Sequence, residues 1–215
     1  MPVKKRRTVK KTVSFSDDNT FATKSSKKKH IDHDSPPVYV RKTISTIPAH
    51  LPALLFYYLY TTESYNTWKL LHLVIPLQVF YLVFQFNKAA VYGNKRLKIN
   101  VTLVLLSLIA AFLLSLPTML IIILFGAPSI QKLKETWLLS LHCCYLAYPV
   151  VYQVFNCDFK VGLWKRYFIL IAVGAWSSCV VIPLDWDRDW QEWPIPIVVG
   201  AYLGAFFGYG FGSYI

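Results

Sequence analysis

The stretch PLDWDRDWQEWPIP, Pro183–Pro196, places four acids, one arginine and three tryptophans between two long apolar runs. Its Asp-x-Asp-x-Asp spacing offers three carboxylates in a row, and such oxygen ligands suit a divalent cation or, through that cation, a phosphate-bearing ligand. Calcium loops need more ligands and usually a glycine at the turn, and this stretch contains no glycine. Two chemical hypotheses follow: a metal-dependent transferase centred on the aspartates, or recognition of a partner protein or lipid headgroup. The candidate residues are Asp185, Trp186, Asp187, Arg188, Asp189, Trp190 and Trp193.

The same stretch also has the composition of a turn at a membrane–water boundary. Tryptophan is favoured at headgroup depth because its ring is apolar and its N–H is polar. Prolines at both ends of the stretch fit the close of one helix and the start of the next, where a missing amide donor costs least. Asp187 and Arg188 can pair with each other or bond to exposed backbone amides. A rigid interfacial turn is therefore the structural interpretation of this stretch.

Glycines recur every four residues in the apolar run that follows. This spacing forms a nearly straight groove on one helix face, and such a groove lets another membrane helix approach closely. The neighbouring helix can belong to this chain or to a partner, and the spacing does not distinguish the two. The GYGFG piece is not a nucleotide fingerprint, because no strand or βαβ pattern surrounds it. The glycines of this face are Gly200, Gly204, Gly208 and Gly212.

Few other polar residues lie in the apolar runs, and none of them forms a recognisable catalytic set. No carboxylate pair and no nucleophile with a positioned base is evident in the sequence, and we expect neither a metal nor a cofactor. Pro76 and Pro117 are expected to break their helices. The four cysteines show no CxxC spacing, which favours free thiols. Polar residues inside membrane spans are candidate functional sites, and we interpret the histidines among them as hydrogen-bonded packing residues. These polar residues are His50, His72, Gln78, His142, Ser107, Ser115 and Ser140.

The composition of the chain is that of a membrane protein, so the elements that position these residues should be membrane-spanning helices. The chain of 215 residues is 55% hydrophobic and only 16% charged, whereas a soluble domain averages about 25% charged residues. About 20 apolar residues cross the ~30 Å hydrocarbon core as a helix. The sequence therefore predicts an all-α, polytopic membrane domain over residues 43–215 with six transmembrane helices and short loops. The predicted spans are 44–60, 68–86, 101–125, 136–155, 167–182 and 194–214.

A basic segment precedes these spans. Residues 1–42 hold twelve lysine and arginine residues against four acids and few large apolar side chains, which is typical of a disordered tail. We interpret it as a cytosolic topology determinant, although a basic tail can also bind nucleic acid or anionic lipid. The loops at 87–100 and 156–166 are also rich in lysine and arginine. The positive-inside rule then predicts cytosolic N- and C-termini and a lumenal Asp185–Trp193 loop.

The block IPLDWDRDWQEWPIP followed by the glycine face, together with FGAP at Phe125–Pro128, resembles the PIG-F family, and its fungal members most closely. The resemblance spans about residues 44–212 and leaves the basic tail outside. Members of that family are stabilising subunits of the glycosylphosphatidylinositol (GPI) ethanolamine-phosphate transferases. The resemblance implies a six-span endoplasmic reticulum protein with no catalytic residues of its own.

The implied function is to bind and stabilise large multi-span transferases that add ethanolamine phosphate to mannose of the GPI precursor. Membrane lipids are the other expected contacts, and no nucleic acid is expected. Under this interpretation the glycine face and the Asp185–Trp193 loop are candidates for holding the partner. A small lipid or GPI-precursor transporter or scramblase is the alternative function, and a metal-dependent intramembrane transferase is a third hypothesis.

Overall fold

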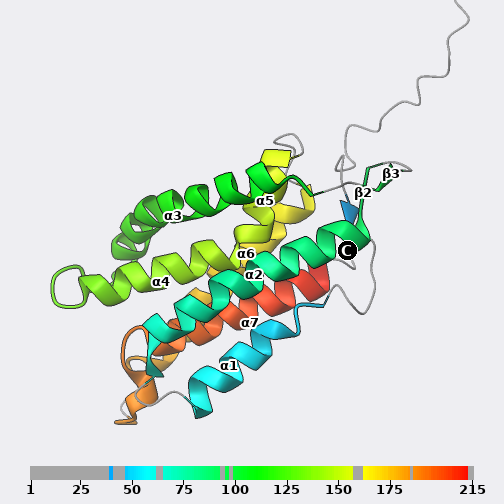
Figure 1. Cartoon of the computed structure of the whole chain (residues 1–215). Coiled ribbons are helices and arrows are strands. Elements are labelled where there is room, and N and C mark those ends of the chain that lie inside the picture. The colour runs from blue at the N-terminus through cyan, green and yellow to red at the C-terminus, as the bar shows by residue number, and fades with distance from the viewer. Residues whose placement is uncertain are drawn as a thin grey trace, which may run out of the picture. The chain divides into compact units, whose positions relative to one another are not determined.

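The computed structural model describes residues 39–40, 47–61, 65–92, 95–96, 99–156, 162–184 and 186–212. The chain divides into two units, residues 1–32 and 33–215, and the first lies wholly outside the described residues. The second unit is built almost entirely of helices (Figure 1). The prediction of an all-helical membrane domain is confirmed at this level. The predicted disordered tail lies outside the described residues except for Tyr39–Val40.

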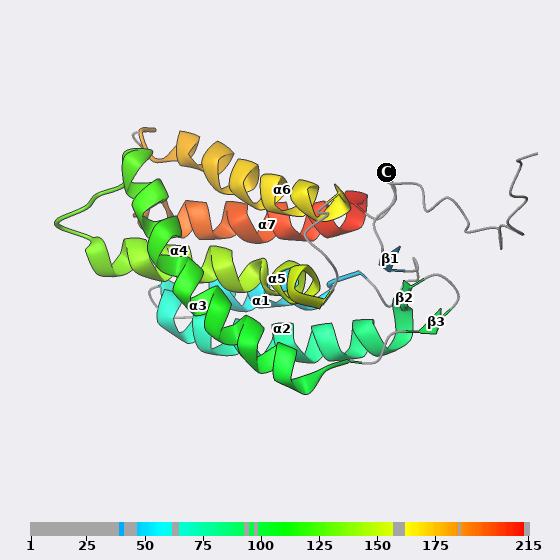
Figure 2. The same cartoon turned by 90° about the horizontal axis from the view of Figure 1, so that it is seen from above.

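The helices follow one another through short connections, and three consecutive pairs pack against each other: α1 with α2, α3 with α4, and α6 with α7. α4 is the central helix, because nine of its 14 residues are buried and it contacts α2, α3, α5, α6 and α7. Figure 2 shows α4 and α5 between the α6–α7 pair on one side and α1 and α2 on the other, with α3 crossing in front of α4. The helices are α1 (His50–Tyr60), α2 (Thr67–Ala89), α3 (Val101–Leu124), α4 (Leu133–Leu146), α5 (Tyr148–Asn156), α6 (Gly162–Ser178) and α7 (Ile195–Gly212).

Three short strands form a small antiparallel sheet at one end of this unit. β1 (Tyr39–Val40) pairs with β2 (Ala90–Tyr92), and β2 pairs with β3 (Lys95–Arg96). The sheet therefore joins the segment before α1 to the connection between α2 and α3. The opposite end carries the connections α1–α2, α3–α4 and α6–α7 (Figure 1). The chain thus alternates between two ends, as a polytopic domain requires.

The prediction of six full-length spans is not met by the lengths of the helices. Among the described residues, α2 and α3 are long and apolar enough to cross a membrane, and α4 with α5 qualifies as a pair bent by 54°. The bend follows from Pro149, which has no N–H to bond to Tyr145 and disfavours helical backbone at Tyr148. α6 and α7 provide shorter apolar helices, Tyr167–Val181 and Ile195–Gly208. The first predicted span becomes an 11-residue helix, α1.

Two predicted helix breaks are wrong. Pro76 lies inside the continuous helix α2, and Pro117 lies inside the continuous helix α3. Membrane helices tolerate proline when nearby groups satisfy the freed backbone. Beside Pro117, the Ser115 hydroxyl donates to the Phe112 carbonyl at 2.6 Å and the Thr118 hydroxyl to the Leu114 carbonyl at 2.8 Å.

Candidate functional site

The connection between α6 and α7 is held in shape by Gln191, a residue that the sequence analysis did not single out. Its side-chain amide donates to the carbonyls of Val181 and Leu184, at 2.8 and 2.6 Å, and its Oε1 accepts from the Arg188 backbone N–H at 3.2 Å. Gln191 is buried, and it is the last residue of the short 3₁₀ helix Asp189–Gln191. One amide group therefore satisfies three backbone groups of the loop and fixes its path.

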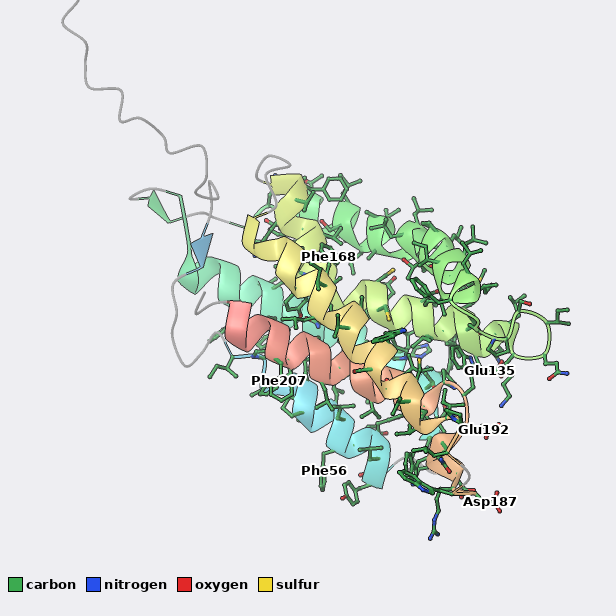
Figure 3. The ribbon with its side chains drawn as sticks, turned by 180° about the vertical axis from the view of Figure 1, so that it is seen from behind. Phe56, Glu135, Phe168, Asp187, Glu192 and Phe207 are labelled. Atoms are coloured by element: carbon green, nitrogen blue, oxygen red, sulfur yellow. The ribbon has the colours of Figure 1, made fainter. Side chains whose placement is uncertain are left out.

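Two further contacts attach the loop to the start of α4. Lys132 and Glu192 form an ion pair at 2.6 Å, and the Trp193 indole N–H donates to Thr136 Oγ1 at 3.2 Å. Thr136 is itself buried, and its single O–H is shared between the Lys132 and Pro128 carbonyls, at 2.9 and 3.1 Å. The α3–α4 and α6–α7 connections are thus joined at one end of the bundle, as Figure 3 shows for Glu135 and Glu192.

The remaining loop residues point away from the bundle. Trp186 is 53% exposed, and Asp187, Arg188 and Asp189 are exposed as well. Asp187 adopts a left-handed backbone with φ of 48°, a conformation that aspartate tolerates better than most residues. In Figure 3 its side chain projects from the loop. The Trp186 and Trp190 rings lie 5.8 Å apart and tilted by 56°, so the loop presents an aromatic pair beside exposed charges.

The predicted site residues therefore fall into different settings. Trp193 is part of the attachment to α4, whereas Trp186, Asp187 and Arg188 are displayed outward, and Trp190 is half-buried. Asp185 lies outside the described residues. Nothing in the structure tests whether these residues bind a partner, so that role stays a prediction.

The glycine face of α7 lies against α6 of the same chain. A Cβ at Gly200 would overlap the Gly174 carbonyl and the Ser178 side chain, and one at Gly204 would overlap the Leu170 carbonyl. A Cβ at Gly208 would meet the Leu170 side chain at 3.1 Å, which is a looser contact. Gly212 ends α7. On α6, Gly174 packs against Gly200 and Gly204, and the sequence analysis did not identify it. Its position in the apolar run before the loop could have indicated a close helix contact.

A buried polar chain links four helices beneath the loop. His142 on α4 contacts the Thr67 carbonyl through Nε2 at 3.0 Å and the Tyr202 hydroxyl through Nδ1 at 3.0 Å. Since a carbonyl only accepts, Nε2 carries the hydrogen and Nδ1 accepts from Tyr202 in the neutral ring. Thr67 Oγ1 in turn lies 3.2 Å from the Tyr58 hydroxyl on α1. His142 is thus the hydrogen-bonded packing residue that the sequence predicted.

No group of three or more His, Cys, Asp or Glu residues that could hold a metal ion occurs among the described residues. Cys143, Cys144 and Cys179 are free thiols, and Cys157 lies outside the described part of the chain. The α6–α7 loop presents aromatic faces and exposed charges.

Apolar helices arranged around a buried polar chain, with an aromatic and charged loop at one end, define a helical integral membrane protein. The family model described as "GPI biosynthesis protein family Pig-F" matches residues 43–213. The chain belongs to this family.

Curated relatives resemble the chain over its whole length. "Glycosylphosphatidylinositol anchor biosynthesis protein 11" of Saccharomyces cerevisiae is 66% identical, and the protein of the same name from Candida glabrata is 61% identical, each match covering 100% of both chains. The Candida albicans protein of that name is 29% identical over 94% of each chain. No solved structure matches the chain.

Proposed function

We propose that this chain is a non-catalytic membrane subunit that binds and stabilises GPI ethanolamine-phosphate transferases in the endoplasmic reticulum. It would act in the addition of ethanolamine phosphate to mannose of the GPI-anchor precursor. Membership of a family described by GPI biosynthesis supports the pathway, as do the names of relatives up to 66% identical. The assignment to a transferase subunit comes from the resemblance of the loop and glycine block to stabilising subunits.

One observation carries the proposal: the α6–α7 loop is rigid, yet it displays its most interaction-prone side chains. Gln191, Glu192 and Trp193 are engaged in holding the loop, while Trp186, Asp187 and Arg188 are exposed. Tryptophan and arginine are enriched among the residues that dominate binding energy at protein interfaces. A fixed loop also loses little conformational entropy when a partner binds. This arrangement favours a docking surface.

The apolar outer faces of the helices provide the second part of the mechanism. α3 exposes large aliphatic side chains along its length, and α6 exposes Phe168, Ile169, Val173 and Trp176. In a bilayer such faces contact lipid or the apolar helices of a partner. We infer that all seven helices are embedded in the membrane, as six antiparallel segments with α4 and α5 forming one. The loop end would be lumenal, and the basic sheet end would be cytosolic.

The test is purification of the full-length tagged chain in a mild detergent, with quantitative mass spectrometry of the proteins that remain bound. We expect near-stoichiometric recovery of a multi-span transferase with the unaltered chain. Arg188→Glu and Trp186→Ala should lower that recovery at least tenfold, because each removes a displayed side chain and keeps the Gln191, Glu192 and Trp193 contacts that hold the loop. Phe80→Ala is the control, since Phe80 is 69% exposed on α2, outside the α6–α7 loop and outside the exposed faces of α3 and α6.

The other functions predict different results in the same preparation. A transporter or scramblase would move lipid when the chain alone is reconstituted in liposomes. A metal-dependent transferase would lose turnover in the Asp187→Asn variant while its assembly with partners stays intact. Recovery of the chain without any transferase would contradict the proposed function.

A further inference from the structure

Helix α1 is about half as long as the membrane is thick. Its 11 residues, His50–Tyr60, rise about 16 Å at ~1.5 Å per residue, whereas the hydrocarbon core is ~30 Å thick. Its last turn lies beside the start of α2, because the Tyr58 hydroxyl is 3.2 Å from Thr67 Oγ1. α1 and α2 run antiparallel, so the first turn of α1 reaches the middle of α2. There the His50 ring lies 4.8 Å from the ring of Tyr81. The N-terminus of α1 therefore lies beside the middle of α2.

Buried polar atoms without partners gather at this helix start. Gln78, in the middle of α2, is only 1% exposed, and neither its Nε2 nor its Oε1 has a hydrogen-bond partner among the described residues. His50 Nε2 is also buried and has none in that set. Gln78 and His50 are near enough to interact, yet no hydrogen bond with good distance and angle joins them. Two polar side chains from different helices thus face one buried position.

The chemistry of these groups limits what can bind there. The Gln78 amide offers two N–H donors and one acceptor, and His50 Nε2 offers a donor or an acceptor. A charged ligand would need an opposite charge, and α1 and residues 70–87 of α2 contain no Lys, Arg, Asp or Glu. The position therefore suits a small neutral group that both donates and accepts. A hydroxyl has these properties.

We propose that a neutral hydroxyl group, from a water molecule or from a lipid, binds between His50 and Gln78 at the start of α1. Buried polar atoms in native proteins are almost always hydrogen-bonded, and inside a membrane an unpaired amide costs several kcal/mol. The bound hydroxyl satisfies the Gln78 amide and fastens the inner end of the half-length helix to α2. This binding site is independent of the proposed transferase partner.

The test is the thermal unfolding of the purified full-length chain with Gln78→Leu. If the amide is bonded to a hydroxyl, the substitution removes those bonds and lowers Tm by about 3–10 °C. If the amide is truly unpaired, leucine is favoured at that position and Tm stays the same or rises, which would overturn the proposal. Phe80→Leu is the matched control on the same helix. Phe80 is 69% exposed, so the Tm of this variant should change little.

The double variant His50→Phe with Gln78→Leu tests whether both residues share the bound group. A shared group makes the loss of Tm in the double variant clearly smaller than the sum of the two single losses, whereas additive losses would contradict a common site. A cryo-electron microscopy map at high resolution adds a direct measurement. Density between the two side chains supports the proposal, and a direct His50–Gln78 hydrogen bond with nothing between them would overturn it.

Nanodiscs of two compositions distinguish the sources of the hydroxyl. Phosphatidylcholine has no hydroxyl group, and dioleoylglycerol has one on a neutral lipid. A higher Tm in phosphatidylcholine containing dioleoylglycerol than in phosphatidylcholine alone, lost in Gln78→Leu, assigns the site to a lipid. Equal Tm values in both nanodiscs, with the Gln78→Leu loss retained, assign it to water.

Discussion

Two helix backbones touch where Gly200 and Gly204 of α7 face Gly174 and Leu170 of α6. A Cβ at Gly174, Gly200 or Gly204 would occupy the place of backbone atoms of the other helix. The contact explains why α6, which makes most of its contacts with α7, stays attached to the bundle. The glycine face that the sequence suggested for a close helix neighbour is therefore occupied within the chain.

The effect of adding one methyl group should differ between two of these glycines. Gly204→Ala places a Cβ against the Leu170 backbone, which cannot move aside, so the variant should lose about 1–3 kcal/mol of stability. Gly208→Ala meets only the Leu170 side chain and the Tyr167 Cα, at 3.1 and 3.6 Å, and should cost clearly less. Thermal unfolding in detergent measures both. Equal losses would show that backbone contact is not what distinguishes the two positions.

The hydrogen bonds of His142 give a second prediction at the scale of single residues. His142→Leu leaves the Tyr202 hydroxyl buried without its partner and removes a bond to the Thr67 carbonyl, so stability should fall by about 1–3 kcal/mol. His72→Leu is the control, because His72 is exposed and its bond to the Trp68 carbonyl stays within one helix. Tyr202→Phe removes only one of the two hydrogen bonds of His142, so it should lower stability less than His142→Leu does. A larger loss in the His72 variant would contradict this assignment.

In the α6–α7 loop, the hydrogen bonds of Gln191 hold the backbone that carries the exposed Trp186 and Asp187. Gln191→Ala removes three hydrogen bonds to the loop backbone and should release Trp186 and Asp187 from a fixed position. We expect transferase recovery to fall as it does for Arg188→Glu, while the helical circular dichroism signal stays unchanged. The measurement is co-purification together with far-ultraviolet circular dichroism of each variant. Loss of helical signal in Gln191→Ala would instead mean that the loop supports folding.

The ion pair that joins the loop to α4 should contribute little by itself. Lys132 and Glu192 are 34% and 66% exposed, and exposed pairs are worth about 0–1 kcal/mol because water and salt screen them. Lys132→Ala should therefore change stability by less than about 1 kcal/mol. Thr136→Val, which removes the buried acceptor of the Trp193 indole, should cost more. Unfolding of the two variants at low and high salt compares these contributions, and only the Lys132 contact should weaken with salt.

The helical unit has two ends of different composition. The strands β2 and β3 and the last turn of α7 lie at one end (Figure 1), and the α6–α7 loop, with Asp187, lies at the other (Figure 3). If the bundle crosses the endoplasmic reticulum membrane as proposed, the two ends face opposite compartments. Lys95→Cys should then react with a membrane-impermeant maleimide in intact microsomes, and Asp189→Cys should react only after the membrane is permeabilised. Labelling of both positions from the same side would contradict the proposed topology.

The sequence predicted the local features of this fold well. Apolar composition and run length indicate buried helices, and the boundaries at α2 and α3 lie close to the predicted spans, because these depend on neighbouring residues. Prolines were less informative: Pro76 and Pro117 stay inside helices, while Pro149 accompanies a real bend. The difference depends on whether the surrounding bundle can satisfy the freed carbonyls, and a single segment does not specify that.

By itself, the sequence determined that the chain forms apolar helices, that one helix has a face open to close approach, and that a rigid turn precedes it. Those properties follow from composition and from spacing within a few residues. Only the tertiary structure decided that α6 fills the glycine groove, that Gln191 shapes the displayed loop, and that α1 stops beside Gln78. His142 meets Thr67 and Tyr202 across 75 and 60 positions of the chain. Such contacts depend on how the helices pack, and packing is a property of the whole bundle.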